Sequence, residues 1–141
     1  MIELEKIIDA LEFVNSCTFG YAYYNNDTNL IYYVGDSINE LEEYDEDFID
    51  SCYVLPSKYQ IDEYSMMEKF IETIKEINIH DELLNSIRGN KAFRRFKDTC
   101  IDYNIIDEWY KYRDEQYKEL AKSWCDENNI KYKESEEYKW K

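Results

Sequence analysis

The chain has 141 residues, a net charge of −15 and a hydrophobic share of 44%, and aromatic residues make up 17% of the whole. This length is typical of one domain, and the hydrophobic share is sufficient for a core. The negative charge repels nucleic acid, anionic membranes and acidic substrates, so it disfavours these partners and favours a basic protein partner or none.

The cysteines and the histidine do not form a metal-binding pattern. The two nearest cysteines, Cys100 and Cys125, are 25 positions apart, and His80 is the only histidine. Because zinc needs clustered Cys and His ligands, we expect no metal and no cofactor. The chain begins with acidic residues instead of a secretory signal, and no run reaches the roughly 18 apolar residues of a membrane span. We therefore expect a cytoplasmic protein with reduced thiols and no membrane partner.

The first half of the chain predicts one helix followed by three strands. Apolar residues at helical spacing predict an amphipathic helix over residues 2–14. Residues 17–24 and 30–35 alternate in polarity around a segment rich in turn formers, which is typical of a hairpin. Residues 51–56 end at a proline and predict a third strand.

Tyrosines crowd this predicted sheet, namely Tyr23, Tyr24, Tyr32, Tyr33 and Tyr53. An exposed aromatic face is one interpretation, because such faces bind partners. We favour a second, in which amphipathic tyrosines replace aliphatic residues on a half-buried sheet.

From Asp62 onward the spacing of apolar residues is helical. The first expected helix has Asp62 as its N-cap, and the second covers residues 81–88 with Gly89 as its C-cap. A third helix is expected to end at Asn104, and a last one near Asn128. These elements predict a single acidic α+β domain over residues 1–141. In it, a small antiparallel three-stranded sheet packs against a helical C-terminal half of three to four helices.

All four arginines, Arg88, Arg94, Arg95 and Arg113, lie in one quarter of the chain. Residues 86–103 carry five bases and two acids, whereas residues 1–62 carry two bases and fourteen acids. Arginine is the preferred cation where a planar group must meet a carboxylate, a phosphate or an aromatic ring. The cluster therefore predicts either a site for an anion or nucleic acid or a set of structural contacts.

We favour the structural interpretation of the arginines, because an acidic envelope opposes a phosphate ligand. In it, Arg94 pairs with Asp98 along one helix, and Arg113 stacks on neighbouring tyrosines. Phe93 and Phe96 then point into the core, and the arginines clamp acidic neighbours.

Residues 36–50 hold eight acids and no base. Ser37 predicts the cap of a short helix with Glu40 as its partner. A calcium loop is disfavoured, because this segment lacks the glycine that such loops need at their sharp turn. A solvated acidic face remains, and its candidate binding residues are Glu42, Glu43, Asp45 and Asp47. Carboxylates on such a face can also mimic the phosphates of nucleic acid.

Catalytic motifs are missing from the sequence, which has no nucleophile elbow, no P-loop and no dinucleotide-binding turn. We therefore expect no catalytic residues and no enzyme. A thiol or carboxylate site is the third-ranked hypothesis, because residues distant in sequence can meet in the fold.

Residues 53–130 resemble the bacterial uncharacterised protein family 0158. The shared features are a strand ending at proline, a Met-Phe helix, a Gly-x-x-Ala-Phe-Arg-Arg-Phe block and a Trp-x-x-x-Arg helix ending in Trp. The matching positions are Pro56, Met67, Phe70, Gly89, Ala92, Phe93, Arg94, Arg95, Phe96, Trp109, Arg113 and Trp124. The Asp27-Thr28 turn is also similar, although Asn29 stands where the family usually has glycine. The resemblance supports the fold and implies no activity, because the family's function is unassigned.

Two functional hypotheses follow. The first is a non-catalytic protein-binding or regulatory module, in which a basic partner contacts residues 36–50. The alternative is binding of nucleic acid or another anion through residues 88–97, or mimicry of nucleic acid by the acidic face.

Overall fold

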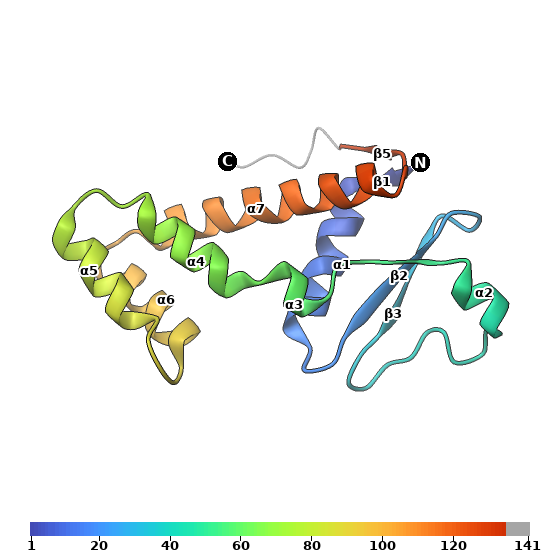
Figure 1. The fold of residues 1–141 in the computed structure, drawn as a ribbon, viewed down its shortest axis with the longest axis horizontal. Helices are drawn as coiled ribbons and strands as arrows, with labels where there is room; N and C mark the ends of the chain where they lie inside the picture. The colour runs from blue at the N-terminus through green and yellow to red at the C-terminus, as the bar shows by residue number, and fades with distance from the viewer. Residues whose placement is uncertain (135–141) are drawn as a thin grey trace. The chain divides into compact units, whose positions relative to one another are not determined.

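Short strands and helices alternate in the first part of the chain, and helices follow from residue 63 (Figure 1). The computed structural model describes residues 1–134, which form two compact units. The sheet unit consists of residues 1–61 and 117–134, and the helical unit of residues 62–116. The α+β class is confirmed. The single domain stays a prediction, because compact units of one chain can fold together or separately.

The sheet unit contains both ends of the described chain. Its elements are β1 (Ile2–Glu3), α1 (Leu4–Ser16), β2 (Tyr21–Asn25), β3 (Leu30–Val34), α2 (Glu46–Asp50), β4 (Tyr53–Val54), α3 (Lys58–Ile61), the last part of α7 (Ile106–Glu127) and β5 (Tyr132–Lys133).

The predicted three-stranded antiparallel sheet is confirmed, with the strand order β3-β2-β4. β2 and β3 form a hairpin whose register runs from Tyr21 opposite Val34 to Asn25 opposite Leu30. The buried Asn25 side chain accepts hydrogen bonds from the Asp27 and Thr28 amides, both at 2.9 Å. These local bonds satisfy the turn, so the turn's own residues set the strand register.

The two faces of the sheet are covered by different segments. Ala22 and Tyr24 are buried on the α1 side, where Phe13 packs edge-to-face on Tyr33 with ring centroids 4.8 Å apart. Tyr32 is buried on the opposite face. The core interpretation of the tyrosines is thus confirmed for Tyr24 and Tyr32, whereas Tyr53 is exposed because it lies on the short edge strand β4.

A second, parallel pair of strands was not predicted. Ile2 lies opposite Tyr132 and Glu3 opposite Lys133, so the helix expected from residue 2 begins at Leu4 instead. α7 ends at Glu127, Asn129 shortly after it is left-handed, and the Ile130 amide donates to the Cys125 carbonyl at 2.8 Å. This turn directs the chain toward β1, and Ile130 is buried beside it.

The helix cap predicted at Ser37 is wrong. Glu40 accepts a hydrogen bond from the Tyr33 amide at 2.8 Å, so its carboxylate serves the edge of β3. The short helix of this segment is α2, which begins later, and Asp45 caps it by accepting from the Phe48 amide at 2.9 Å. The helix therefore forms where Asp45 caps it, and its Phe48 packs on Tyr32.

The helical unit consists of α4 (Glu63–Glu72), α5 (Ile77–Ser86), α6 (Ala92–Asp102) and the first part of α7. Its centre is an aromatic cluster of Phe70, Phe96 and Trp109, whose ring centroids are 4.9 to 6.1 Å apart. The rings meet edge-to-face, which is the favoured geometry for aromatic pairs. The core positions expected for Phe96 and Trp109 are therefore confirmed.

The predicted ends of these helices are partly correct. Asp62 caps α4 by accepting from the Ser65 amide at 3.2 Å, and Asn104 ends α6 in a left-handed conformation. α5 begins at residue 77 because the Glu76 carboxylate accepts from its first amides. It ends at Ser86, so Gly89 lies in the following loop. No helix within residues 1–134 is both long enough and apolar enough to cross a membrane.

Candidate binding surface

The acidic segment, residues 36–50, is held on the sheet by apolar contacts. Leu41 is buried, and the rings of Tyr44 and Phe48 stack with centroids 4.3 Å apart. Both rings meet Tyr32 of β3 edge-to-face, at 5.4 and 5.5 Å. The segment therefore covers one face of the sheet through its aromatic residues and turns its carboxylates outward.

The carboxylates divide into structural and free groups. Asp36 accepts from the Thr18 and Phe19 amides, and these two bonds lower the pKa of its carboxyl. Glu40 and Asp45 also bond to backbone amides. Asp45, one of the candidate residues, thus has a structural role that sequence reasoning missed. An Asp three residues before Phe48, at the start of a helix, is the sequence pattern that could have predicted this cap.

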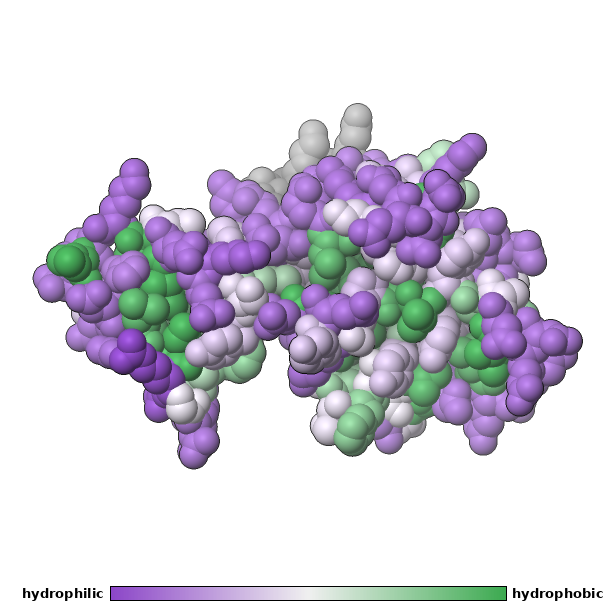
Figure 2. Space-filling model, in the orientation of Figure 1, coloured by the Kyte–Doolittle hydropathy of each residue, from purple (hydrophilic) through white to green (hydrophobic). Residues whose placement is uncertain are grey.

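The remaining carboxylates of the segment are exposed, namely Glu42, Glu43, Glu46, Asp47 and Asp50. None of them forms an ion pair with any of residues 1–134. The surface over α2 is accordingly hydrophilic (Figure 2). The candidate residues Glu42, Glu43 and Asp47 are thus exposed carboxylates, and Glu46 and Asp50 of the same segment are exposed as well.

A hollow of about 540 Å³ lies between the acidic segment and the start of β3. Its lining includes Glu40, Glu42 and Glu43 from the acidic segment and Leu30 and Tyr32 from β3. No Lys or Arg of the described residues lines it. We call this hollow the acidic pocket.

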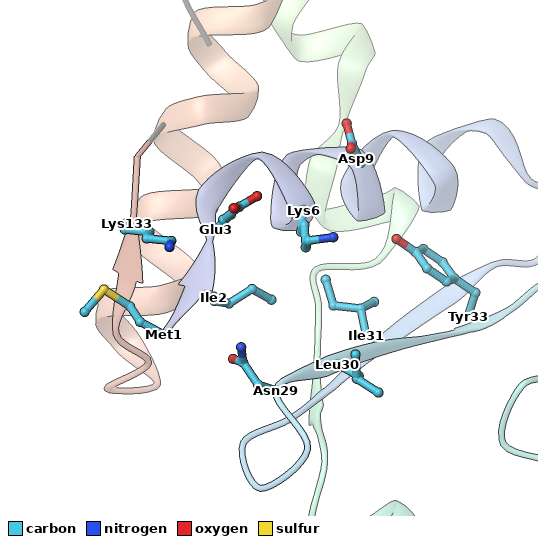
Figure 3. Close-up of a pocket in the computed structure, with 10 residues that line it drawn as sticks. All are labelled: Met1, Ile2, Glu3, Lys6, Asp9, Asn29, Leu30, Ile31, Tyr33 and Lys133. Carbon is cyan, nitrogen blue, oxygen red and sulfur yellow. The ribbon is translucent and has the colours of Figure 1, made fainter. Parts of the chain in front are cut away.

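A second hollow of about 350 Å³ lies on the α1 side of the same strand (Figure 3). We call it the mixed pocket, because Lys6 and Lys133 line it together with Glu3 and Asp9. Burial, followed by the nearby carboxylates Glu12 and Glu5, raises the pKa of Asp9. Figure 3 shows the Lys6 amine and the Tyr33 hydroxyl pointing toward one another across the hollow.

Two of the four arginines are held by structural contacts. Arg113 donates to the Glu63 carboxylate at 3.1 Å, and Glu63 is only 7% exposed. Arg95 donates from Nε to the Ser86 carbonyl at 3.0 Å, which joins α6 to the end of α5. The acidic neighbour predicted for Arg95 is a backbone carbonyl instead. Arg113, whose predicted stacking on tyrosines stays a prediction, meets a carboxylate. Its partner is fifty positions away and was not foreseeable from spacing.

Arg88 and Arg94 are exposed, as is Arg95. Arg88 and Arg94 form no ion pair with any of residues 1–134, so the predicted Arg94–Asp98 pair is wrong. Phe93 is also not buried as expected, since 45% of it is exposed beside Tyr64. Phe96 on the same helix fills the core position, whereas Phe93 lies in the first turn of α6 and stays partly exposed.

The nucleophilic and metal-binding side chains of residues 1–134 do not gather at a metal site. Burial raises the pKa of Cys100 to about 12 and that of Cys125 to about 11, so both stay protonated thiols at neutral pH. His80 lies 3.2 Å from Asp81 at the surface. Within residues 1–134, no group of His, Cys, Asp and Glu is placed to hold a metal ion.

Comparison with known proteins identifies relatives. A family model described as Uncharacterised protein family (UPF0158) matches residues 2–140. UPF0158 protein PA5073 of Pseudomonas aeruginosa is 29% identical over 66 residues, which are 46% of this chain and 43% of that protein. The chain thus matches less than half the length of this relative. No solved structure matches the chain.

Proposed function

Because this chain belongs to the uncharacterised protein family UPF0158, whose name assigns no activity, we propose a function from its surface. The protein is a non-catalytic protein-binding module that recognises a basic protein partner through the acidic segment. A regulatory role follows where such binding blocks the partner's own contacts. Mimicry of nucleic acid is the special case in which the partner is itself a nucleic-acid-binding protein.

The observation that carries the proposal is the separation of roles within the acidic segment. Tyr44, Phe48 and Leu41 hold the backbone in place, while five carboxylates project from it without an ion pair to residues 1–134. Like charges placed side by side on a surface repel one another, and a basic partner relieves that repulsion. Charge complementarity of this kind steers association and makes it sensitive to salt.

The test neutralises the five exposed acids and leaves the structural ones intact. The variant carries Glu42→Gln, Glu43→Gln, Glu46→Gln, Asp47→Asn and Asp50→Asn. Asp36, Glu40 and Asp45 are kept, because their hydrogen bonds to backbone amides hold the segment. We expect the immobilised variant to recover at least tenfold less of the basic proteins that the natural chain retains from a cell extract.

A matched control removes the same charge elsewhere. It carries five substitutions of exposed acids in the helical unit, Glu68→Gln, Glu72→Gln, Asp98→Asn, Asp102→Asn and Glu115→Gln. If retention depends on the acidic segment, this control behaves like the natural chain. Equal loss in both variants indicates a response to net charge alone, and unchanged recovery in the first variant contradicts the proposal.

A second candidate function rests on a different observation. Arg94 and Phe93 are both exposed on α6, so a cation and an aromatic ring are available together. This combination is typical of single-stranded nucleic-acid contacts, in which bases stack on rings. A gel-shift titration at low salt, where phosphate contacts are strongest, tests it. Binding by the natural chain that is lost with Arg94→Gln supports this candidate, and no shift by the natural chain excludes it.

A further inference from the structure

We propose that the basic partner is docked as an extended strand, which adds to the open edge of β3 at Leu30–Tyr32. This inference rests on the proposed function and specifies its mode. The occupant is a peptide segment in which basic and uncharged side chains alternate.

The backbone groups of Ile31 point away from the sheet. In the sheet order β3 is an outer strand, and apart from the single bridge between Val34 and Asn39 no strand of residues 1–134 pairs with its other side. Tyr33 uses its outward groups to bond the acidic segment, with its amide donating to Glu40 at 2.8 Å and its carbonyl accepting from the Glu40 amide at 2.9 Å. Because outward and inward groups alternate along a strand, the amide and carbonyl of Ile31 face outward as well.

The opposite strand supports this orientation. Ala22, which pairs with Tyr33, uses its carbonyl to accept from the Leu55 amide at 2.8 Å and therefore faces away from β3. Tyr24, two residues after Ala22 on the same strand, pairs with Ile31, and its backbone groups face away from β3 like those of Ala22. Neither backbone group of Ile31 is thus required by β2.

The chain itself closes the β3 edge from Tyr33 onward, and the opening lies at Ile31. The Gly35 amide donates to the Ile38 carbonyl at 2.8 Å, and Asn39 bridges Val34. No comparable bond to the outward groups of Ile31 comes from residues 1–134. Unpaired edges promote unwanted association, so proteins normally close them, and an edge left open beside two hollows indicates a use.

The two hollows lie on opposite faces of this same edge. Leu30 and Ile31 line both of them, the acidic pocket on the side of Tyr32 and the mixed pocket on the side of α1. Successive side chains of a strand point to opposite faces. A strand added beside Ile31 therefore directs alternate side chains into the two pockets, which is how strand addition combines affinity with specificity.

The charges of the pockets define the peptide. The acidic pocket presents Glu40, Glu42 and Glu43 without a base and selects Lys or Arg. The mixed pocket balances Lys6 and Lys133 against Glu3 and Asp9, and its apolar part includes Ile2 and Ile31. It selects an uncharged, aliphatic side chain, because an added charge of either sign meets a like charge there.

A second copy of this chain is a poor occupant of the same edge. Pairing two copies edge to edge brings their acidic pockets together, and each chain carries a net charge of −15. Like charges across an interface disfavour the pairing.

The test uses the complete chain and a fluorescent eight-residue peptide in which Lys alternates with Val, with fluorescence anisotropy as readout. Two further peptides are N-methylated at every second backbone amide, one at the Lys residues and the other at the Val residues. N-methylation removes the amide donors and leaves the charge unchanged. We expect one N-methylated peptide to bind at least tenfold more weakly than its parent and the other to bind equally well. Equal binding by all three overturns the proposal.

Variants of the chain separate the edge from the charge. Glu42→Gln combined with Glu43→Gln changes the acidic pocket, while Asp47→Asn combined with Asp50→Asn removes the same charge outside it. We expect the first pair to weaken binding at least fivefold more than the second. Equal effects indicate that charge anywhere on the segment suffices, which overturns docking at the edge and leaves the proposed function standing.

Hydrogen exchange of individual backbone amides tests strand addition directly, because it is measured on the natural chain and involves no substitution that could disturb the fold. We expect the saturating parent peptide to slow hydrogen exchange of the Ile31 amide at least tenfold, without slowing that of the exposed acidic-segment residue Glu43. Unchanged exchange at Ile31 in the presence of bound peptide contradicts strand addition. If the chain instead forms a dimer at higher concentration and the dimer no longer binds the peptide, the occupant of the edge is a second copy. That result also overturns the proposal.

Discussion

The side chains of Glu63 and Arg113, fifty positions apart in the chain, meet in a buried contact. The Glu63 side chain is 6% exposed and that of Arg113 is 19% exposed. Removing one partner of a buried pair leaves the other charge poorly compensated. We therefore expect Arg113→Met to lower the free energy of unfolding by about 3 kcal/mol, as measured by urea denaturation.

The control for this residue is Lys111→Met on the same helix, where the side chain is exposed. It should change stability by no more than about 0.5 kcal/mol. The double variant Glu63→Gln with Arg113→Met should lose less than the sum of its single changes, because the two side chains are coupled. An Arg113→Met variant as stable as the natural chain would show that the pair contributes no net stability.

At the scale of the elements, two helices end in the same way. Asn104 and Asn129 both have positive φ, 59° and 56°, and both values lie within a few degrees of the ideal left-handed conformation. In both, the next residue donates back to a carbonyl five positions earlier, in Cys100 or Cys125, at 2.8 Å. Asparagine and glycine tolerate this conformation better than other residues.

We expect Asn129→Ala to lower the free energy of unfolding by about 1 kcal/mol, whereas Asn129→Gly leaves it equal or slightly higher. Asn78→Ala is the matched control, since Asn78 is an exposed helical residue without positive φ. Thermal unfolding followed by circular dichroism measures all three. An Asn129→Ala variant no less stable than Asn78→Ala would contradict the role of the left-handed cap.

At the scale of the whole molecule, the sheet unit is discontinuous in sequence and the helical unit is continuous. The core of the sheet unit needs Tyr117, Ala121 and Cys125 from the end of α7, and the Trp124 indole donates to the Val54 carbonyl at 3.0 Å. A fragment of residues 1–61 lacks all of these. The aromatic cluster of the helical unit lies entirely within residues 62–116.

We therefore expect the fragment 62–116 to fold alone and the fragment 1–61 to remain unfolded. Trp109 is the only tryptophan of the first fragment, and its fluorescence should stay blue-shifted until a cooperative urea transition. Circular dichroism of the second should lack an unfolding transition. An unfolded fragment 62–116 would instead support the single domain that the sequence predicts.

The sequence by itself determined the features that depend on neighbours along the chain. The α+β class, the hairpin around Asn25, the cap at Asp62 and the end of α6 at Asn104 were all predictable. Each is set by turn chemistry or by the spacing of apolar residues within one segment, and such signals are readable without knowing what lies opposite.

Only the tertiary structure decided which groups meet across long separations. It paired Arg113 with Glu63, joined β1 to β5, exposed Phe93 while burying Phe96, and assigned Asp45 to a cap and Glu42 to a pocket. Carboxylates are abundant in this chain, so composition cannot say which one a given cation reaches. That choice depends on the geometry of packing, which brings together residues whose separation in sequence carries no signal.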